Sequence, residues 1–444
     1  MPELFDPVLE KTLRKDKKYL QSTQLPIVTV SGTYQEDLKR MHGLPDIDTT
    51  QDIVFSRAHY SMAVGVACQV WGGKQDPKKA WLADPTNYVS ADDWFSVQLT
   101  DKVGKTIARY PILKTVKDLI DRFGRQKLPI LNSITEPLLY LTENVNQPIL
   151  SLHIATGNIL VGQGKTVLQV ITDPHVRYDY VTYADQPNLY YCVFDENTKL
   201  ELLEKAALQD KKLDASRIFV TGSPVDPRIV ACRDKKTPWR SGVLKLALTT
   251  GGLGTNKTEI EQLLLQFLPE LRRQKPALKL IVYAGTHHDI ATMVREMAKQ
   301  HRVAVGADND RSAKLRLLYH PQIVDANELL IKYAFPWAHG FITKPSGDMT
   351  YDAVAAGCFV LTLREWGEWE HQIREIFEQQ DISRRANVEQ ILTQLAVLQS
   401  AQGKAQSWIE KAMHNVLRID RLYLNGAKNI VAAYKQVSKL SVNR

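Results

Sequence analysis

Residues 341–363 read FITKPSGDMTYDAVAAGCFVLTL. This stretch contains a short apolar run, a polar turn at KPSGD, a run of small residues and a second apolar run. Short apolar runs bounded by Gly and Pro are typical of buried strands, and the segment between them has the length and composition of a helix. The stretch therefore predicts a strand–loop–helix–strand unit, which is the connection that joins parallel strands.

The same alternation of strand and helix extends over most of the chain. In the second half, VLKLALTTGGLGTNKTEIEQLLLQFL (243–268) and LKLIVYAGTHHDIATMVREMAKQ (278–300) each read as strand, loop and helix. In the first half, TVLQVIT (166–172) and NLYYCVFD (188–195) read as strands. The order predicts an α/β protein with parallel sheets, and the polar stretch at 233–242 suggests a linker between two of them.

The predicted organisation is two Rossmann-like domains, 1–230 and 231–405, followed by a helical segment at 406–444. Residues 1–50 read as a loose leader punctuated by Pro and Gly, with one charged helix as a candidate at its opening. QDIVFS (51–56) reads as the first buried strand, and RAHYSMAVGVACQVW (57–71) reads as the helix after it.

Composition narrows the class of protein. Hydrophobic residues make up 44% and charged residues 24% of the 444, as in ordinary globular proteins. The four cysteines form no CxxC pair, so we expect them to be reduced and structural. The opening residues do not resemble a signal peptide and no apolar run is long enough to span a bilayer, so we expect a cytoplasmic protein.

The chain carries a net charge of +8, which favours anionic partners. Residues 102–125 show helical spacing with seven basic residues against two acidic ones. This segment is either a solvated helix face or a surface for anionic lipid headgroups, the latter predicting peripheral binding to the inner membrane face.

Two loops in the second half are candidate phosphate sites. Glycine allows close approach of the backbone to a ligand, and helix N-termini attract anions. The candidate contacts for a diphosphate are Gly251, Gly252, Gly254, Ser346, Gly347, Met349 and Thr350. Asp352, one helical step further, is a candidate for binding the hydroxyls of a ribose. Tight structural turns, and stabilisation of a helix dipole by Asp352, are the alternative interpretations.

With these motifs the second half resembles the glycosyltransferases that include the peptidoglycan lipid-intermediate N-acetylglucosaminyltransferases and the monogalactosyldiacylglycerol synthases. ITKPSGDMTYDAVAAGCFVLTL is similar to the family signature ITKxGxxTxxEAxxxGxPxI, and LALTTGGLG to its glycine loop. QIVDANELL looks like the stretch whose backbone holds the base, and RIFVTGSPVDPRI like the interdomain passage. The resemblance implies the GT-B fold, with two domains facing across a cleft and a C-terminal helix that crosses back.

The resemblance also assigns roles to residues. It places the base against the backbone of Ile323 and Val324, and it makes Glu370, His371 and Gln372 candidate contacts to the donor sugar. Two positions depart from the signature, because Asp352 replaces a glutamate and Asp348 replaces a glycine.

Two residues of the first domain are candidate catalytic bases. His59 occupies the place of the family histidine, although the glycines that precede it in the family are missing. Asp173, in the motif TDPH, is the competing base. A histidine or carboxylate at a helix start can also act only as a cap or a packed side chain.

The function expected from these features is an inverting hexosyltransferase. It would move a sugar from a UDP-sugar to a hydroxyl acceptor, with a membrane lipid as the candidate acceptor, and would need neither a metal nor a cofactor. Nucleic acid is not an expected partner. The alternatives are a UDP-sugar epimerase or hydrolase on the same fold, and a nucleotide-sugar-binding protein without catalysis. We expect no P-loop at GQGKT (162–166) and no metal site at THHD (286–289) or DND (308–310).

Overall fold

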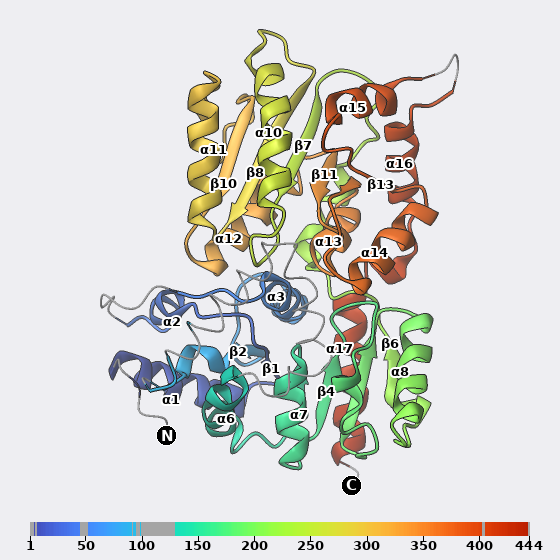
Figure 1. Ribbon diagram of the computed structural model, residues 1–444. Helices are drawn as coiled ribbons and strands as arrows, with labels where there is room; N and C mark the ends of the chain where they lie inside the picture. The colour runs from blue at the N-terminus through green and yellow to red at the C-terminus, as the bar shows by residue number, and fades with distance from the viewer. Residues whose placement is uncertain are drawn as a thin grey trace. The chain divides into compact units, whose positions relative to one another are not determined.

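The computed structural model describes residues 7–44, 52–90, 129–401 and 405–442, together with Leu4, 92–94 and Gln98. The chain divides into two compact units (Figure 1). Unit 1 comprises Met1–Pro227 and Leu422–Arg444, and unit 2 comprises Arg228–Arg421. Each unit is an α/β structure with its own parallel sheet, which confirms the predicted pair of Rossmann-like domains.

The sheet of unit 1 has six strands in the order β2-β1-β3-β4-β5-β6, and every pairing is parallel. Nearly all of the strand residues are buried, as expected for a sheet covered by helices on both faces. The strands are β1 (Leu25–Val28), β2 (Ala80–Ala83), β3 (Ile149–Ser151), β4 (Val167–Val170), β5 (Leu189–Val193) and β6 (Ile218–Val220).

The helices of unit 1 connect these strands and cover the sheet (Figure 1). They are α1 (Pro7–Ser22), α2 (Gln35–Met41), α3 (Arg57–Trp71), α6 (Pro129–Thr142), α7 (Ile154–Gly162), α8 (Glu196–Leu208) and α17 (Gly426–Val442). The four-residue helix α9 (Pro227–Val230) spans the boundary with unit 2.

Two expectations for the first 56 residues are wrong. The predicted leader instead contains α1, β1 and α2, and β1 is a central strand of the sheet. Within the predicted strand at 51–56, Val54 forms only an isolated antiparallel bridge to Gly32. The loop after the first strand therefore does contain a glycine, Gly32. Its φ is +154°, and a Cβ there would lie 2.4 Å from the Ile53 carbonyl oxygen.

The predicted segment 406–444 is divided between the units. Helix α16 (Trp408–Leu417) belongs to unit 2, whereas α17 returns to unit 1. Close backbone contact fixes the start of α17, because a Cβ on Gly426 would lie 1.7 Å from the carbonyl oxygen of Ser223. Further along, the Asn429 amide donates to the Thr221 carbonyl at 2.9 Å, and the Tyr434 hydroxyl donates to the Pro148 carbonyl at 2.7 Å.

The sheet of unit 2 has seven parallel strands in the order β13-β12-β11-β7-β8-β10-β9. Its strands are β7 (Leu244–Thr249), β8 (Leu278–Gly285), β9 (Val305–Gly306), β10 (Leu315–Tyr319), β11 (Gly340–Thr343), β12 (Phe359–Thr362) and β13 (Ser383–Arg385). The expected linker at 233–242 lies inside unit 2, where Trp239 is part of the core.

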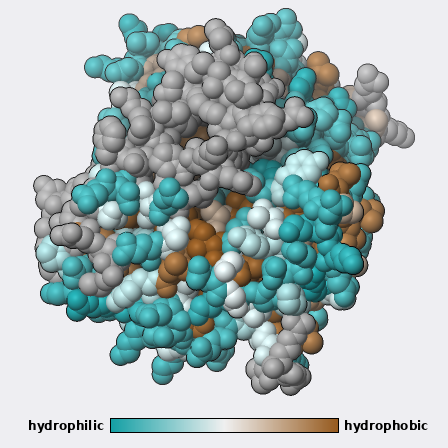
Figure 2. Space-filling model, turned by 60° about the horizontal axis from the view of Figure 1, so that its bottom comes forward, coloured by the Kyte–Doolittle hydropathy of each residue, from teal (hydrophilic) through white to brown (hydrophobic). Residues whose placement is uncertain are grey.

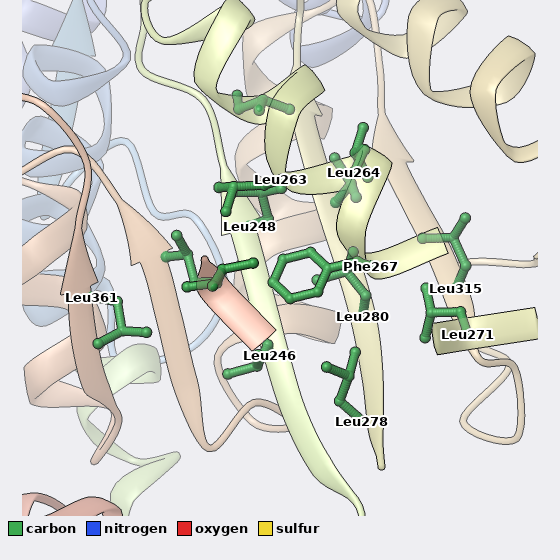
Figure 3. Close-up of a cluster of buried hydrophobic side chains, with 14 of the residues drawn as sticks. Leu246, Leu248, Leu263, Leu264, Phe267, Leu271, Leu278, Leu280, Leu315 and Leu361 are labelled. Atoms are coloured by element: carbon green, nitrogen blue, oxygen red, sulfur yellow. The ribbon is translucent and has the colours of Figure 1, made fainter. Parts of the chain in front are cut away.

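Alternation along the strands builds the core of unit 2. Leu246, Leu280 and Leu315 point from neighbouring strands to one face, where Phe267 of α10 packs against them (Figure 3). The helices are α10 (Lys257–Arg272), α11 (His288–Gln300), α12 (Ile323–Leu329), α13 (Met349–Ala355), α14 (Glu368–Gln379), α15 (Ile391–Gln399) and α16. A π-helical segment, Leu330–Ala334, continues α12.

Both sheets reverse their winding direction once. In unit 2 the chain runs outward from β7 to β8 and to β9 at the edge, places β10 between β8 and β9, and then returns to β11 on the other side of β7. In unit 1 it runs from β1 to β2 and returns to β3 on the other side of β1. Ligands of such sheets bind beyond the carboxyl ends of the strands at this reversal, the topological switch point. These points are therefore the first places to look for sites.

The basic segment 102–125 lies outside the described residues. Of the helices that the structure describes, none combines the length and the apolar character needed to cross a membrane. In the view of Figure 2 the described surface is mostly hydrophilic, with hydrophobic residues gathered near its centre.

Candidate functional site

The loop after β7 supplies one side of the switch point in unit 2. It runs from Thr250 to Asn256 and leads into α10, a helix of 16 residues. Gly254 adopts φ +66° and its amide donates to the Gly251 carbonyl at 2.9 Å, which folds the loop back on itself. No side chain caps α10, so its first amides face the edge of the sheet without a side-chain acceptor.

The loop after β11 lies against this glycine loop. Pairing of Ile342 with Leu248 brings the ends of β11 and β7 side by side. A Cβ on Gly251 would lie 2.7 Å from Cε and 3.2 Å from Cδ of Lys344, so the absence of a side chain at 251 admits the lysine stem. The two loops predicted to share a ligand are thus in contact.

A histidine holds the glycine loop from the other side. Nε2 of His287, just before α11, lies 3.2 Å from the Gly251 carbonyl oxygen and 3.1 Å from that of Gly252. An Nε2–H group donating to these carbonyls holds this part of the loop in place. His287 belongs to the motif THHD, so its role here is to position the loop.

The loop after β11 is tied by its own side chains. The Ser346 amide donates to Thr350 Oγ1 at 3.1 Å, and the Met349 amide donates to Ser346 Oγ at 3.2 Å. The Ser346 hydroxyl in turn donates to the carboxylate of Asp348 at 2.7 Å. Asp348 is therefore turned into its own loop. The amides of Ser346 and Met349 therefore donate to side chains of the same segment. Gly347 lies between these two residues.

Two carboxylates lie beside the loop. Asp352, in the first turn of α13, is only 5% exposed, and its amide donates to the Asp348 carbonyl at 2.8 Å. Glu370, in the first turn of α14, is fully buried. Its carboxylate forms an ion pair with Lys344 and accepts from the Trp366 amide at 2.6 Å. Lys344 thus lies between the glycine loop and a buried carboxylate.

The remaining predicted residues of unit 2 occupy both ends of the same edge. Ile323, buried at the start of α12, follows β10 with Val324 beside it. His371 and Gln372 follow Glu370 on α14, where His371 is half exposed and its Nε2 lies 3.0 Å from Glu375. From β10 to β11 the edge spans three strand spacings, about 14 Å.

In unit 1, His59 lies at the corresponding edge. It is the third residue of α3, and its amide donates to the side chain of the N-cap residue Ser56 at 3.4 Å. Its Nε2 lies 3.3 Å from Thr172 Oγ1. Its ring meets the ring of His153 edge-on, with centroids 4.9 Å apart. His153 caps α7, and its Nδ1 accepts the Ala155 amide at 3.2 Å. When neutral, His153 therefore carries its proton on Nε2.

Asp173 follows Thr172 directly and is partly buried. Its neighbour His175 is engaged elsewhere, with Nδ1 3.0 Å from Glu201. Burial acts to raise the pKa of Glu201, but hydrogen bonds from His175, Lys205 and the Val176 amide outweigh it and lower the pKa to about 2. His175 is therefore held in a contact with Glu201, whereas Asp173 shares the edge with His59.

Neither unit assembles a metal centre from the residues that the structure describes. No group of three or more His, Cys, Asp or Glu side chains within those ranges could hold a metal ion. In the DND motif, Asp310 accepts the Ser312 hydroxyl at 2.6 Å, and this bond closes a turn.

Four residues of these edges were not predicted. His153 and Thr172 both contact His59. Lys344 and His287 contact the glycine loop. Lys344 stands in the opening motif and His287 in THHD. The signal was present in both, but their roles depend on contacts with a loop 36 or more residues away.

Comparison with known proteins shows the fold. No protein-family model matches the sequence, and no curated protein matches it. Among solved structures, the chain is similar to a UDP-N-acetylglucosamine 2-epimerase, with 14% identity, a TM-score of 0.50 and coverage of 95% of this chain and 97% of that one. It is also similar to the alpha,alpha-trehalose 6-phosphate synthase of Burkholderia multivorans, with 12% identity, a TM-score of 0.53 and coverage of 94% and 100%. The expected GT-B type of fold is thereby confirmed.

Proposed function

We propose that this protein is an enzyme that acts on a nucleotide sugar, and that it transfers the sugar to a hydroxyl acceptor with inversion. The observation that carries the proposal is the contact between two loops at the switch point of unit 2, where the stem of Lys344 lies on Gly251. Phosphates favour backbone amides, an uncapped helix start and a nearby lysine. This edge supplies all three.

The nucleotide is assigned along the edge of unit 2. In this proposal the diphosphate contacts Gly251–Gly254, Gly347 and Lys344, and the base lies against the backbone of Ile323 and Val324. Asp352 accepts from the ribose hydroxyls, because a carboxylate matches two adjacent hydroxyls. The span of about 14 Å from β10 to β11 is long enough for a nucleoside diphosphate.

Glu370 is assigned a supporting role. It is fully buried and paired with Lys344, so in this proposal it orients the lysine. The partly exposed His371 and Gln372 remain the proposed contacts to the donor sugar.

In this proposal, a residue of unit 1 accepts the proton of the acceptor hydroxyl. In the proposed reaction, His59 or Asp173 takes the proton of the acceptor hydroxyl, and the oxygen bonds to C1 of the sugar. The C1–O bond to the nucleoside diphosphate breaks, and the leaving group departs with the electron pair. Amides, the start of α10 and Lys344 stabilise the negative charge that develops on the diphosphate.

Epimerisation of the sugar is the second candidate. The observation that favours it is the pair of imidazoles, His59 and His153, with centroids 4.9 Å apart. Inversion at a carbon by removing and returning a proton needs a base and an acid, and two neighbouring histidines provide them. One of the structures similar in fold is, by its name, a UDP-N-acetylglucosamine 2-epimerase.

A mass-spectrometric screen tests these proposals. The full chain is incubated with a panel of UDP-sugars, with and without a lipid extract, and the products and released UDP are measured. Transfer predicts UDP release only with an acceptor present. Epimerisation predicts an isomeric UDP-sugar without an acceptor, and hydrolysis predicts UDP and free sugar without one.

Variants locate the activity. His59→Ala and Asp173→Asn should each be compared with His301→Ala and Asp210→Asn, which change the same residue types at positions outside both edges. We expect the His59 or Asp173 variant to lose at least a hundredfold in turnover while UDP binding is kept. Asp352→Asn should weaken UDP binding itself. Binding of UDP without any turnover would identify a non-catalytic nucleotide-sugar-binding protein, and absence of UDP binding would refute the proposal.

A further inference from the structure

A row of cations crosses the amino end of the sheet in unit 2, away from the proposed nucleotide edge. Lys245 on β7 pairs in register with Lys279 on β8, and Arg316 on β10 pairs with Ile281, two residues further along β8. The residues that alternate with them, such as Leu246 and Leu280, belong to the core of Figure 3. The three cations therefore share the opposite face of the sheet.

Among the described residues, no carboxylate forms a hydrogen bond or an ion pair with this row, although the charges of Asp310 and Asp308 act on Arg316 and favour its charged form. Lys279 Nζ donates to the carbonyl oxygen of Ser312 at 2.7 Å, and Arg316 Nη1 donates to the carbonyl oxygen of Asp308 at 2.8 Å. Carbonyl oxygens satisfy hydrogen bonds but carry no full charge. Within the described part of the chain, Lys245, Lys279 and Arg316 form no ion pair with a carboxylate.

Arg316 is the most unusual member. It is 2% exposed, and its guanidinium lies 4.5 Å from the ring centroid of Trp337. Its Nε and Nη2 atoms are buried, and among the described residues neither has a hydrogen-bond partner. A buried donor without an acceptor is costly, so two such donors on one cation point to an acceptor that the chain itself does not supply.

The surroundings of Lys245 show the same excess of positive charge. Burial lowers its pKa, and Lys236, Lys279, Arg311 and Arg316 lower it further. His339, whose Nδ1 accepts the Lys245 amide at 3.2 Å, has its pKa lowered to about 4 by burial and then by Lys236 and Lys245. Lysines directly opposite on neighbouring strands repel each other.

We propose that Lys245, Lys279 and Arg316 form a second anion site, which binds a small soluble di- or polyphosphate. Two strand spacings and an offset of two residues separate the Cα atoms of Lys245 and Arg316, about 12 Å, and their long side chains can converge from this span on two or three linked phosphates. The guanidinium fork provides paired donors to one phosphate, and the lysines add point charges. Because Arg316 is 2% exposed, its unpaired donors are reached only by a small ligand that inserts between the side chains around it, and not by a bilayer or a nucleic-acid duplex.

A calorimetric titration of the full chain with inorganic pyrophosphate tests the site. Lys245→Met/Lys279→Met removes two of its cations, and Lys275→Met/Lys299→Met removes the same charge from exposed positions of unit 2. We expect the first variant to lose pyrophosphate affinity by about tenfold or more, and the second to change less than twofold. Arg316→Gln should reproduce the loss.

Saturating UDP is included in a repeat of each titration, so that any pyrophosphate bound at the other edge is displaced. If UDP does not bind, the proposed function fails but the titration still reports on this row. A thermal melt without ligand gives an independent readout. Removal of the facing lysines should raise the melting temperature by a degree or more while abolishing the stabilisation by pyrophosphate. Equal affinities for the wild type and Lys245→Met/Lys279→Met, or equal losses in both double variants, would overturn the proposal.

Discussion

Replacement of Lys344 by methionine should destabilise unit 2 strongly. The Glu370 side chain is 1% exposed and that of Lys344 is 16% exposed, so water does not replace the lost ion pair. Removal of one partner of a buried pair costs about 3–5 kcal/mol, because the other charge stays buried. Since the Trp366 amide still donates to Glu370, we expect a loss near the lower end, about 3 kcal/mol.

A thermal melt measures this loss. For a unit that spans 228–421, a loss of about 3 kcal/mol lowers the melting temperature by roughly 6–12 °C. The matched control is Lys257→Met, which breaks the ion pair with Asp289, where both side chains are more than a third exposed. An exposed pair contributes about 0–1 kcal/mol, so the control should shift the melt by only a few degrees at most.

The double variant Lys344→Met/Glu370→Gln separates charge from packing. Glutamine still accepts from the Trp366 amide but carries no charge, so the double variant should be more stable than Lys344→Met alone by about 1–2 kcal/mol. The reasoning is refuted if the two substitutions are additive, or if Lys344→Met melts no lower than Lys257→Met.

Three further outcomes are expected. Gly251→Ala places a Cβ 2.7 Å from Lys344 Cε and should weaken UDP binding about tenfold in a calorimetric titration, with an unchanged affinity contradicting the assignment. Glu201 has a folded pKa of about 2 against 4.5 for the free side chain, so its stabilising effect is complete above pH 4.5 and is lost as the pH falls towards 2. In urea titrations, Glu201→Gln should thus cost about 2–3 kcal/mol at pH 7 and little at pH 2.5; an equal cost at both values would argue against the ion pair. Gly426→Ala should lower the melting temperature because its Cβ would lie 1.7 Å from the Ser223 carbonyl oxygen, although helix propensity alone predicts a rise.

Much of the fold was predictable from sequence because its strands are short apolar runs that alternate with helices. The α3 segment, 57–71, agrees with the predicted helix, and α1 agrees with the charged helix predicted at the opening of the chain. Leu9, Leu13 and Leu20 share the buried face of α1. The first strand, LPIV at 25–28, was missed because only four residues separate this helix from a loop with polar residues.

The candidate sites were predictable only in part. Strand–loop–helix motifs locate Gly251 and Asp352 at a sheet edge, because parallel strands all end on the same side. The order of the strands decides which loops contact each other. Neither motif by itself predicts that β7 and β11 are neighbours. The contact of Lys344 with Gly251 follows from that adjacency, as does the contact of His59 with Thr172 from the order in unit 1.

The return of the chain to unit 1 at Leu422 has a consequence for biosynthesis. Unit 2, from Arg228 to Arg421, is complete before α17 has been translated, although the first half of unit 1 precedes it. At about 5–20 residues per second, the ribosome needs roughly 10–40 s between Pro227 and Leu422. During that interval the backbone at Gly222 and Ser223 lacks its contacts with Leu422 and Gly426. Of the two units, unit 1 begins to be translated first and is finished last.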